Sequence, residues 1–123
     1  MPDKPVTEVW LGQTPALHPN ILQLYKQVEL VSQDALNEVL SAMLKHRAVG
    51  SLHEGHSIIL EEFEEFWEEV KKKRSERDLP KLREELIQVA AMAIRTIFDV
   101  VDPLIASELL SKSDVSKDSS SVG

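Results

Sequence analysis

Apolar residues recur at three- and four-residue steps through the middle of the chain, the spacing that puts side chains on one face of an α-helix. The pattern predicts three helices, at about 20–46, 56–74 and 80–101. The apolar face of the first is formed by Ile21, Tyr25, Val28, Ala35, Val39 and Met43. No strand-type alternation is present, so the predicted fold class is all-α, a bundle of three main helices.

Breakers and caps set the predicted boundaries. The first and second helices are separated by "AVGSLHEG", interpreted as a loop that ends at Gly55. Asp78 is a predicted N-cap with Pro80 in the first turn of the third helix. Pro103 is predicted to kink or end that helix, with a further turn or two reaching Leu110.

Composition divides the chain into three parts. Five breakers make residues 1–19 an irregular arm. Residues 20–110 form the predicted helical domain, and the serine-rich, charged residues 111–123 are predicted to be a disordered tail.

The net charge of −7 argues against nucleic-acid phosphates or anionic lipid as partners. The chain has no cysteine, which excludes thiol catalysis and thiolate zinc sites. No signal peptide and no apolar run of membrane-spanning length is visible, so the expected location is cytoplasmic.

The acidic second helix separates into faces on a helical wheel. The predicted core stripe consists of Ile59, Phe63, Phe66, Trp67 and Val70. Three glutamates fall roughly opposite and are predicted to be solvated: Glu61, Glu64 and Glu68. Three others lie along the edge of the apolar stripe: Glu62, Glu65 and Glu69. Like charges at this spacing repel, and partial burial adds to their cost, so a bound cation would relieve the conflict. Solvation or pairing with bases elsewhere is the alternative.

The third helix supplies possible partners for that edge. Its predicted core stripe is Leu82, Leu86, Val89, Ala93, Ile97 and Val100. Glu85 and Gln88 lie together on one edge, which Met92, Arg95 and Asp99 continue. If the two helices are antiparallel neighbours, two pairs of oxygen ligands converge. Hard divalent cations prefer such oxygen clusters.

A second apolar stripe on the third helix, formed by Ile87, Ile94 and Phe98, predicts contact with another subunit. We therefore expect a homodimer or a larger homo-oligomer such as a homotetramer. Oligomerisation would complete a core like that of a four-helix bundle.

These residues resemble the MazG-type all-α nucleoside triphosphate pyrophosphohydrolases, which carry EExxE on one helix and ExxD on the next. The first motif is Glu61-Glu62-Phe63-Glu64-Glu65 and the second is Glu85-Leu86-Ile87-Gln88. The wider context, "HEGHSIILEEFEEFWEEVKKK" followed by "LREELIQVAAMAIR", is similar to a small MazG-like branch of bacteria and their phages. The resemblance covers about 34–101.

The resemblance implies hydrolysis of a nucleoside triphosphate, ribo or deoxy, to a monophosphate and pyrophosphate. Mg²⁺, with Mn²⁺ as an alternative, would be held by Glu62, Glu65, Glu85 and Gln88. Glu61 and Glu62 are the candidate catalytic residues, Glu61 for orienting or deprotonating water. Gln88 replaces the family's aspartate; its carbonyl oxygen still ligates hard cations but removes one charge.

Three further residues are candidates for binding substrate: Arg95 on the edge of the metal ligands, Lys73 in the basic run after the second helix, and His56. For the basic run, interaction with the helix dipole is the plainer interpretation. "HEGH" has its histidines at i,i+3 rather than the i,i+4 of a helical zinc site, so a zinc or iron site there is only an alternative.

A second function class stays open beside the enzyme. Gln88 and the absence of an obvious general base also fit a catalytically silent helical homo-oligomer that serves as a protein-interaction module.

Overall fold

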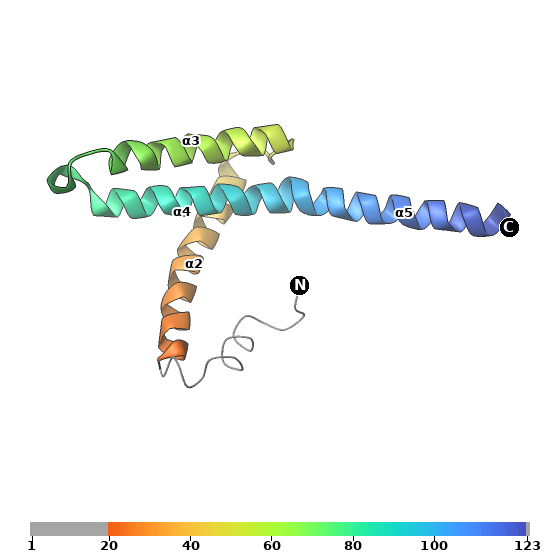
Figure 1. Ribbon diagram of the computed structural model, residues 1–123, viewed down its shortest axis with the longest axis horizontal. Coiled ribbons are helices and arrows are strands. Elements are labelled where there is room, and N and C mark those ends of the chain that lie inside the picture. The colour runs from red at the N-terminus through yellow and green to blue at the C-terminus, as the bar shows by residue number, and fades with distance from the viewer. Residues whose placement is uncertain (1–19, 123) are drawn as a thin grey trace. The chain divides into compact units, whose positions relative to one another are not determined.

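The computed structural model describes residues 20–122, with side chains described as far as residue 113. The predicted N-terminal arm, 1–19, lies outside the described residues. The helical elements are α2 (Ile21–Lys45), α3 (Leu52–Val70), the short 3₁₀ turn η1 (Arg74–Glu76), α4 (Leu79–Thr96), the π-helical turn η2 (Ile97–Val101) and α5 (Asp102–Val122). Residues 20–122 contain no strand, which confirms the all-α class. Because α4, η2 and α5 continue one another, three main helices result (Figure 1).

The chain divides into two compact units, the first ending at Asp34 and the second beginning at Ala35. Helix α2 nevertheless continues without interruption through residues 32–34. The Ser32 hydroxyl donates to the Val28 carbonyl one turn earlier, at 3.0 Å, so its polar group is satisfied inside the helix. In the second unit, Val39 and Ala42 of α2 pack with Ala91 and Met92 of α4 to form the buried core, against which Ile58 and Ile59 of α3 also pack.

Helix α3 begins at Leu52, so the prediction of a loop as far as Gly55 was wrong. Ser51 is the N-cap, and its hydroxyl accepts a hydrogen bond from the Glu54 amide at 3.0 Å. The Glu54 carboxylate in turn accepts from the Gly50 amide at 3.3 Å. This serine-to-glutamate pattern resembles a capping box, which outweighs the low helix propensity of Gly55.

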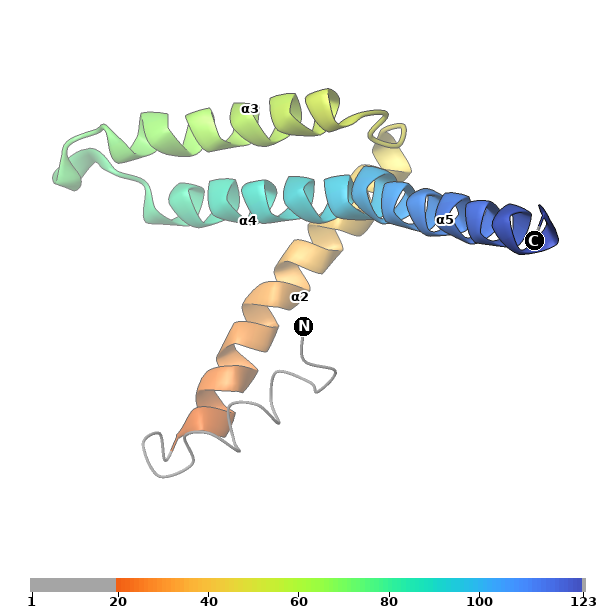
Figure 2. The same cartoon turned by 45° about the vertical axis from the view of Figure 1, so that its right-hand side comes forward.

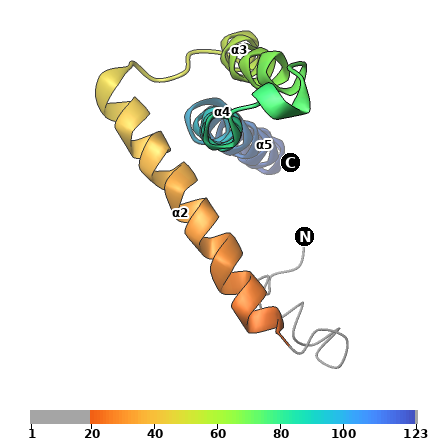
Figure 3. The same cartoon turned by 90° about the vertical axis from the view of Figure 1, so that its left-hand side faces the viewer.

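Helices α3 and α4 form an antiparallel hairpin and lie side by side in all three views (Figures 1, 2 and 3). Gly55 marks a close approach between them: a Cβ atom there would lie 2.5 Å from Thr96 Cγ2 and 2.8 Å from Thr96 Oγ1. Thr96 is buried, and its hydroxyl donates to the Met92 carbonyl at 2.9 Å. A glycine is therefore required at this position near the start of α3.

The Gly55→Ala substitution is expected to destabilise the protein although alanine favours helix. The buried, β-branched Thr96 cannot yield freely, so the helices must separate, at a cost of about 1–3 kcal/mol. Thermal unfolding measures the loss. The double variant with Thr96→Ala should lose less stability than the sum of the two single variants. Additive effects would contradict this account.

The opposite end of the hairpin is closed by a buried carboxylate. Glu69 is 1% exposed; its oxygens accept from the Asp78 amide at 2.7 Å and pair with Lys72 Nζ at 2.7 Å. The Lys72 ammonium, followed by the Asp78 amide, lowers the pKa of Glu69. Asp78 caps α4 as predicted, accepting from the Lys81 amide at 3.1 Å, with Pro80 in the first turn. Glu69, which the helical wheel placed on the same edge as Glu62 and Glu65, thus stabilises the turn between α3 and α4.

The predicted core stripes are only partly correct. In α3, Phe63 and Trp67 are each 52% exposed. In α4, Leu86 and Ile97 are about half-exposed. The buried or half-buried positions instead include residues that the wheels assigned to an edge, namely Glu62, Glu85, Met92 and Arg95. Gly55 and Thr96, where α3 and α4 approach closely, are buried as well, whereas the aromatic side chains of Phe63 and Trp67 remain half-exposed.

Pro103 does not end the third helix. It lies in the first turn of α5, directly after η2. The backbone is helical over 111–122, where composition predicts a disordered tail. This stretch contains neither proline nor glycine, the residues that most often end a helix. Within the described residues, no helix combines the length and apolar character needed to cross a membrane.

Candidate metal centre

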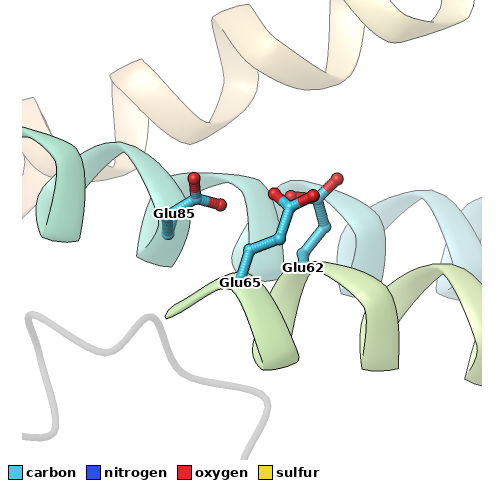
Figure 4. Close-up of side chains that lie close together, drawn as sticks. All are labelled: Glu62, Glu65 and Glu85. Carbon is cyan, nitrogen blue, oxygen red and sulfur yellow. The ribbon is translucent and has the colours of Figure 1, made fainter. Parts of the chain in front are cut away.

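Three carboxyl groups converge where α3 lies beside α4. Glu62 and Glu65, one turn apart on α3, meet Glu85 of α4 (Figure 4). One oxygen from each lies within 4.8 Å of the other two. This is the only group of three or more possible metal ligands found among the described histidine, aspartate and glutamate side chains, and no histidine belongs to it.

Burial and mutual repulsion make the three carboxyl groups unfavourable as anions. Burial, followed by the charges of Glu65 and Glu85, raises the pKa of Glu62 to about 7. Burial, followed by a hydrogen bond with Glu65, also raises the pKa of Glu85. The metal-free protein therefore retains protons here that isolated carboxyl groups would have lost near pH 4.5.

A second observation shows that the cluster lacks a partner. The Glu85 side chain is buried, and its Oε2 atom has no hydrogen-bond partner among the described residues. A buried oxygen without a partner is costly and uncommon. A hard cation would coordinate this oxygen and offset the repulsion between the carboxylates. The donor set is all oxygen, which fits Mg²⁺ or Mn²⁺ rather than a thiophilic metal.

A cleft of about 520 Å³ opens beside the cluster, formed by α3, α4 and the part of α2 after Asp34. Glu62 belongs to both the cluster and the cleft. Gln88, one turn after Glu85 on α4, lines the cleft together with Glu62. The cleft thus gives a bound molecule access to a metal ion held by the cluster.

The predicted site residues divide into two sets. Glu61 lines the cleft, although its wheel position indicated solvent, and Arg95 is buried in the cleft wall. Lys73 and His56 are exposed and are not among the residues that line the cleft. Lys73 follows the end of α3 near the hairpin turn, and His56 lies on an exposed side of α3. The structure therefore does not bring these two residues to the cluster.

Sequence reasoning missed the contribution of α2 and the loop after it. Glu38, Lys45, His46 and Arg47 all line the cleft. Glu38 directly precedes the buried Val39, which was an available signal that it lies near the core. The arrangement of the 46–50 loop depends on contacts with α4, which no local pattern reveals.

Comparison of the chain with protein-family models, with curated proteins and with solved structures finds no match, so the likeness to the MazG-type enzymes depends on the motif residues alone.

Proposed function

We propose that the protein is a Mg²⁺-dependent nucleotide pyrophosphohydrolase of the MazG-like kind. One observation carries the proposal: Glu62, Glu65 and Glu85 converge from two helices around a buried carboxylate oxygen without a partner, beside an open cleft. These glutamates occupy the motif positions that the resemblance assigns to metal binding. The order and spacing of EExxE and ExxQ support the same function.

In the proposed reaction, water attacks phosphorus and the bond to the oxygen bridging the α- and β-phosphates breaks, which releases a monophosphate and pyrophosphate. Mg²⁺ bound by Glu62, Glu65 and Glu85, with Gln88 as a neutral ligand, would offset the charge of the phosphates. Glu61, exposed on the cleft wall, orients the water and accepts its proton.

The proposal is tested by incubating the purified protein with standard and modified nucleoside triphosphates, ribo and deoxy, in the presence of Mg²⁺ or Mn²⁺. We expect equal amounts of monophosphate and pyrophosphate from at least one of them, and no reaction with EDTA. Absence of pyrophosphate from the whole panel, together with no Mg²⁺ binding by calorimetry, would refute the enzyme.

The second candidate function is a catalytically silent interaction module. It is favoured by Gln88, which lowers the charge of the site, and by the exposed apolar side chains on α3 and α4. Metal binding separates the two candidates. A protein that binds neither Mg²⁺ nor Mn²⁺ but self-associates tightly fits the module.

We also propose that the chain forms a homo-oligomer through the apolar faces that remain uncovered. Four large apolar side chains expose between 40% and 64% of their surface: Phe63 and Trp67 of α3, Ile94 of α4 and Phe98 of η2. Large apolar side chains gathered on one face of a helix usually meet another protein surface. A second copy is the proposed occupant, since it offers the same two faces in return.

Size-exclusion chromatography with light scattering should give at least the mass of a dimer at micromolar concentration. The Phe98→Glu variant is expected to dissociate, because a carboxylate would be buried without a partner. Ser75→Glu, which adds the same charge in the exposed turn between α3 and α4, should leave the mass unchanged. A wild-type monomer would remove this proposal.

A further inference from the structure

One end of the cleft is basic in a chain whose net charge is −7. Lys45, His46 and Arg47, at the end of α2 and the start of the following loop, line this end together with Arg95 of α4. The motif glutamates Glu61 and Glu62 line the cleft as well. A cleft lined by both acidic and basic side chains is suited to a ligand whose two ends differ chemically.

Arg95 is the central group at the basic end. Its side chain is 5% exposed, and its Nε atom has no hydrogen-bond partner within the part of the chain that the structure describes. Nη2 donates to the Arg47 carbonyl at 2.9 Å, and Nη1 contacts Met92 Sδ at 3.5 Å. Within residues 35–113, none of the ion pairs includes Arg95. A buried guanidinium without a carboxylate is costly, and an oxyanion is the group that would satisfy it.

The loop beside Arg95 is held in place from two sides. On one side, the Val49 amide of the loop donates at 2.9 Å to Oδ2 of Asp99, which lies four residues after Arg95. On the other side, the Arg95 guanidinium donates to the Arg47 carbonyl of the loop. Glu54, an acidic residue of the cleft wall, is occupied by Arg47 at 3.2 Å and by the Gly50 amide. These contacts fix the backbone of the loop beside Arg95 and pair Arg47 with the Glu54 carboxylate, so Lys45 and His46 are the other basic side chains of the cleft wall.

We propose that the Arg95 end of the cleft is an oxyanion site, for a phosphate or carboxylate group, that works without a metal. Gln88 and Arg95 are seven residues apart on α4, about 10 Å at a rise of 1.5 Å per residue. The ligand would therefore carry an anionic group separated from the one at the metal cluster. The site uses none of the proposed metal ligands, so it stands if the hydrolase proposal fails.

The test uses inorganic phosphate and the full-length protein stripped of metal with EDTA. Phosphate titration should shift the Arg95 Nε–H signal in a ¹⁵N NMR spectrum, whereas chloride at the same ionic strength should not. Arg95→Lys keeps the charge but lacks the Nε–H, and is expected to weaken phosphate binding about tenfold, as for loss of a charge-assisted hydrogen bond. Lys73→Ala, a basic residue outside the cleft, is the matched control and should bind like the wild type.

If Arg95→Lys does not fold, the exposed rim residue Lys45 replaces it: Lys45→Met should weaken binding about threefold. An Arg95 Nε–H signal whose chemical shift does not change on phosphate titration would refute the proposed site. So would a Lys73→Ala variant that loses as much affinity as the Arg95 or Lys45 variant. Because no metal is present and no turnover is measured, these results are separate from those of the hydrolysis assay.

Discussion

Replacing Glu62 by glutamine is expected to abolish metal-dependent hydrolysis while making the metal-free protein more stable. The substitution keeps the shape of the side chain and its ability to hydrogen-bond with Glu65, but removes one of three clustered charges. Loss of a ligand should lower Mg²⁺ affinity and activity by at least about a hundredfold, since even residues behind the ligands cost 10–100-fold. Relief of repulsion should raise the melting temperature of the metal-free protein at pH 8 by about 3 °C.

The matched control is Glu64→Gln, which makes the same change on an exposed part of α3, outside both the cluster and the cleft. It should change neither metal affinity nor activity. Calorimetric Mg²⁺ titration, pyrophosphate release and thermal melts with EDTA measure the three quantities. If Glu62→Gln binds Mg²⁺ like the wild type, the glutamate cluster is not the metal site.

The second large effect concerns how stability depends on pH. Without metal, stability is expected to fall as pH rises from 4.5 to 7, and bound Mg²⁺ is expected to reverse this trend. Glu62 has a pKa of about 7 in the folded protein and 4.5 as an isolated group. Between these values the folded state binds more protons than the unfolded state, so stability of the metal-free protein falls as pH rises. Glu85, whose pKa is also raised, acts in the same direction.

Metal binding requires the ionised carboxylates, so Mg²⁺ affinity should rise with pH up to about 7, and binding should release protons. Thermal melts with Mg²⁺ and with EDTA at pH 5.5 and pH 8 should show the larger metal-induced shift at pH 8. Calorimetry in buffers of different ionisation enthalpy counts the released protons. Equal shifts at both values would contradict coupled titration at this site.

Below pH 4.5 stability is expected to fall as pH falls, because another residue, Glu69, becomes protonated. Glu69 has a lowered pKa, so its contribution is present above 4.5 and is lost as pH falls through the folded value. In the Glu62→Gln variant the decline between 4.5 and 7 should therefore flatten, while the acid limb due to Glu69 should remain. Glu62 and Glu69, two turns apart on one helix, thus limit stability from opposite sides.

The sequence was sufficient to predict the helices and their order, because apolar periodicity and caps are local signals. Asp78 and Pro80 located the start of α4 correctly. The start of α3 was missed because the glycine in "HEGH" was interpreted as a breaker. Its place inside a helix depends on Thr96, which lies 41 positions further along the chain and reveals its role only in the packed hairpin.

The acidic cluster could be predicted because its members share one edge of a helix with a matching edge on the next. A helical wheel does not show which stripe of a helix faces the neighbouring helices. Apolar side chains such as Phe63 were expected to do so, yet the helices meet through small and charged residues. A single chain also cannot reveal on its wheel whether an apolar stripe meets its own core or another copy.

The π turn at Ile97–Val101 has a consequence for everything that follows it. The Asp102 backbone amide donates to the Ile97 carbonyl, five residues back, so the turn holds one residue more than an α-helix would. The wider turn takes up this residue, whereas an extra residue inside a regular α-helix would turn everything after it by about 100° about the axis. Leu104 and Ile105 therefore point nearly as they would after a continuous α-helix that is one residue shorter. Deleting one residue from this turn is expected to restore an α-helix and leave the direction of α5 almost unchanged, while the same deletion in the middle of α4 would redirect the whole helix.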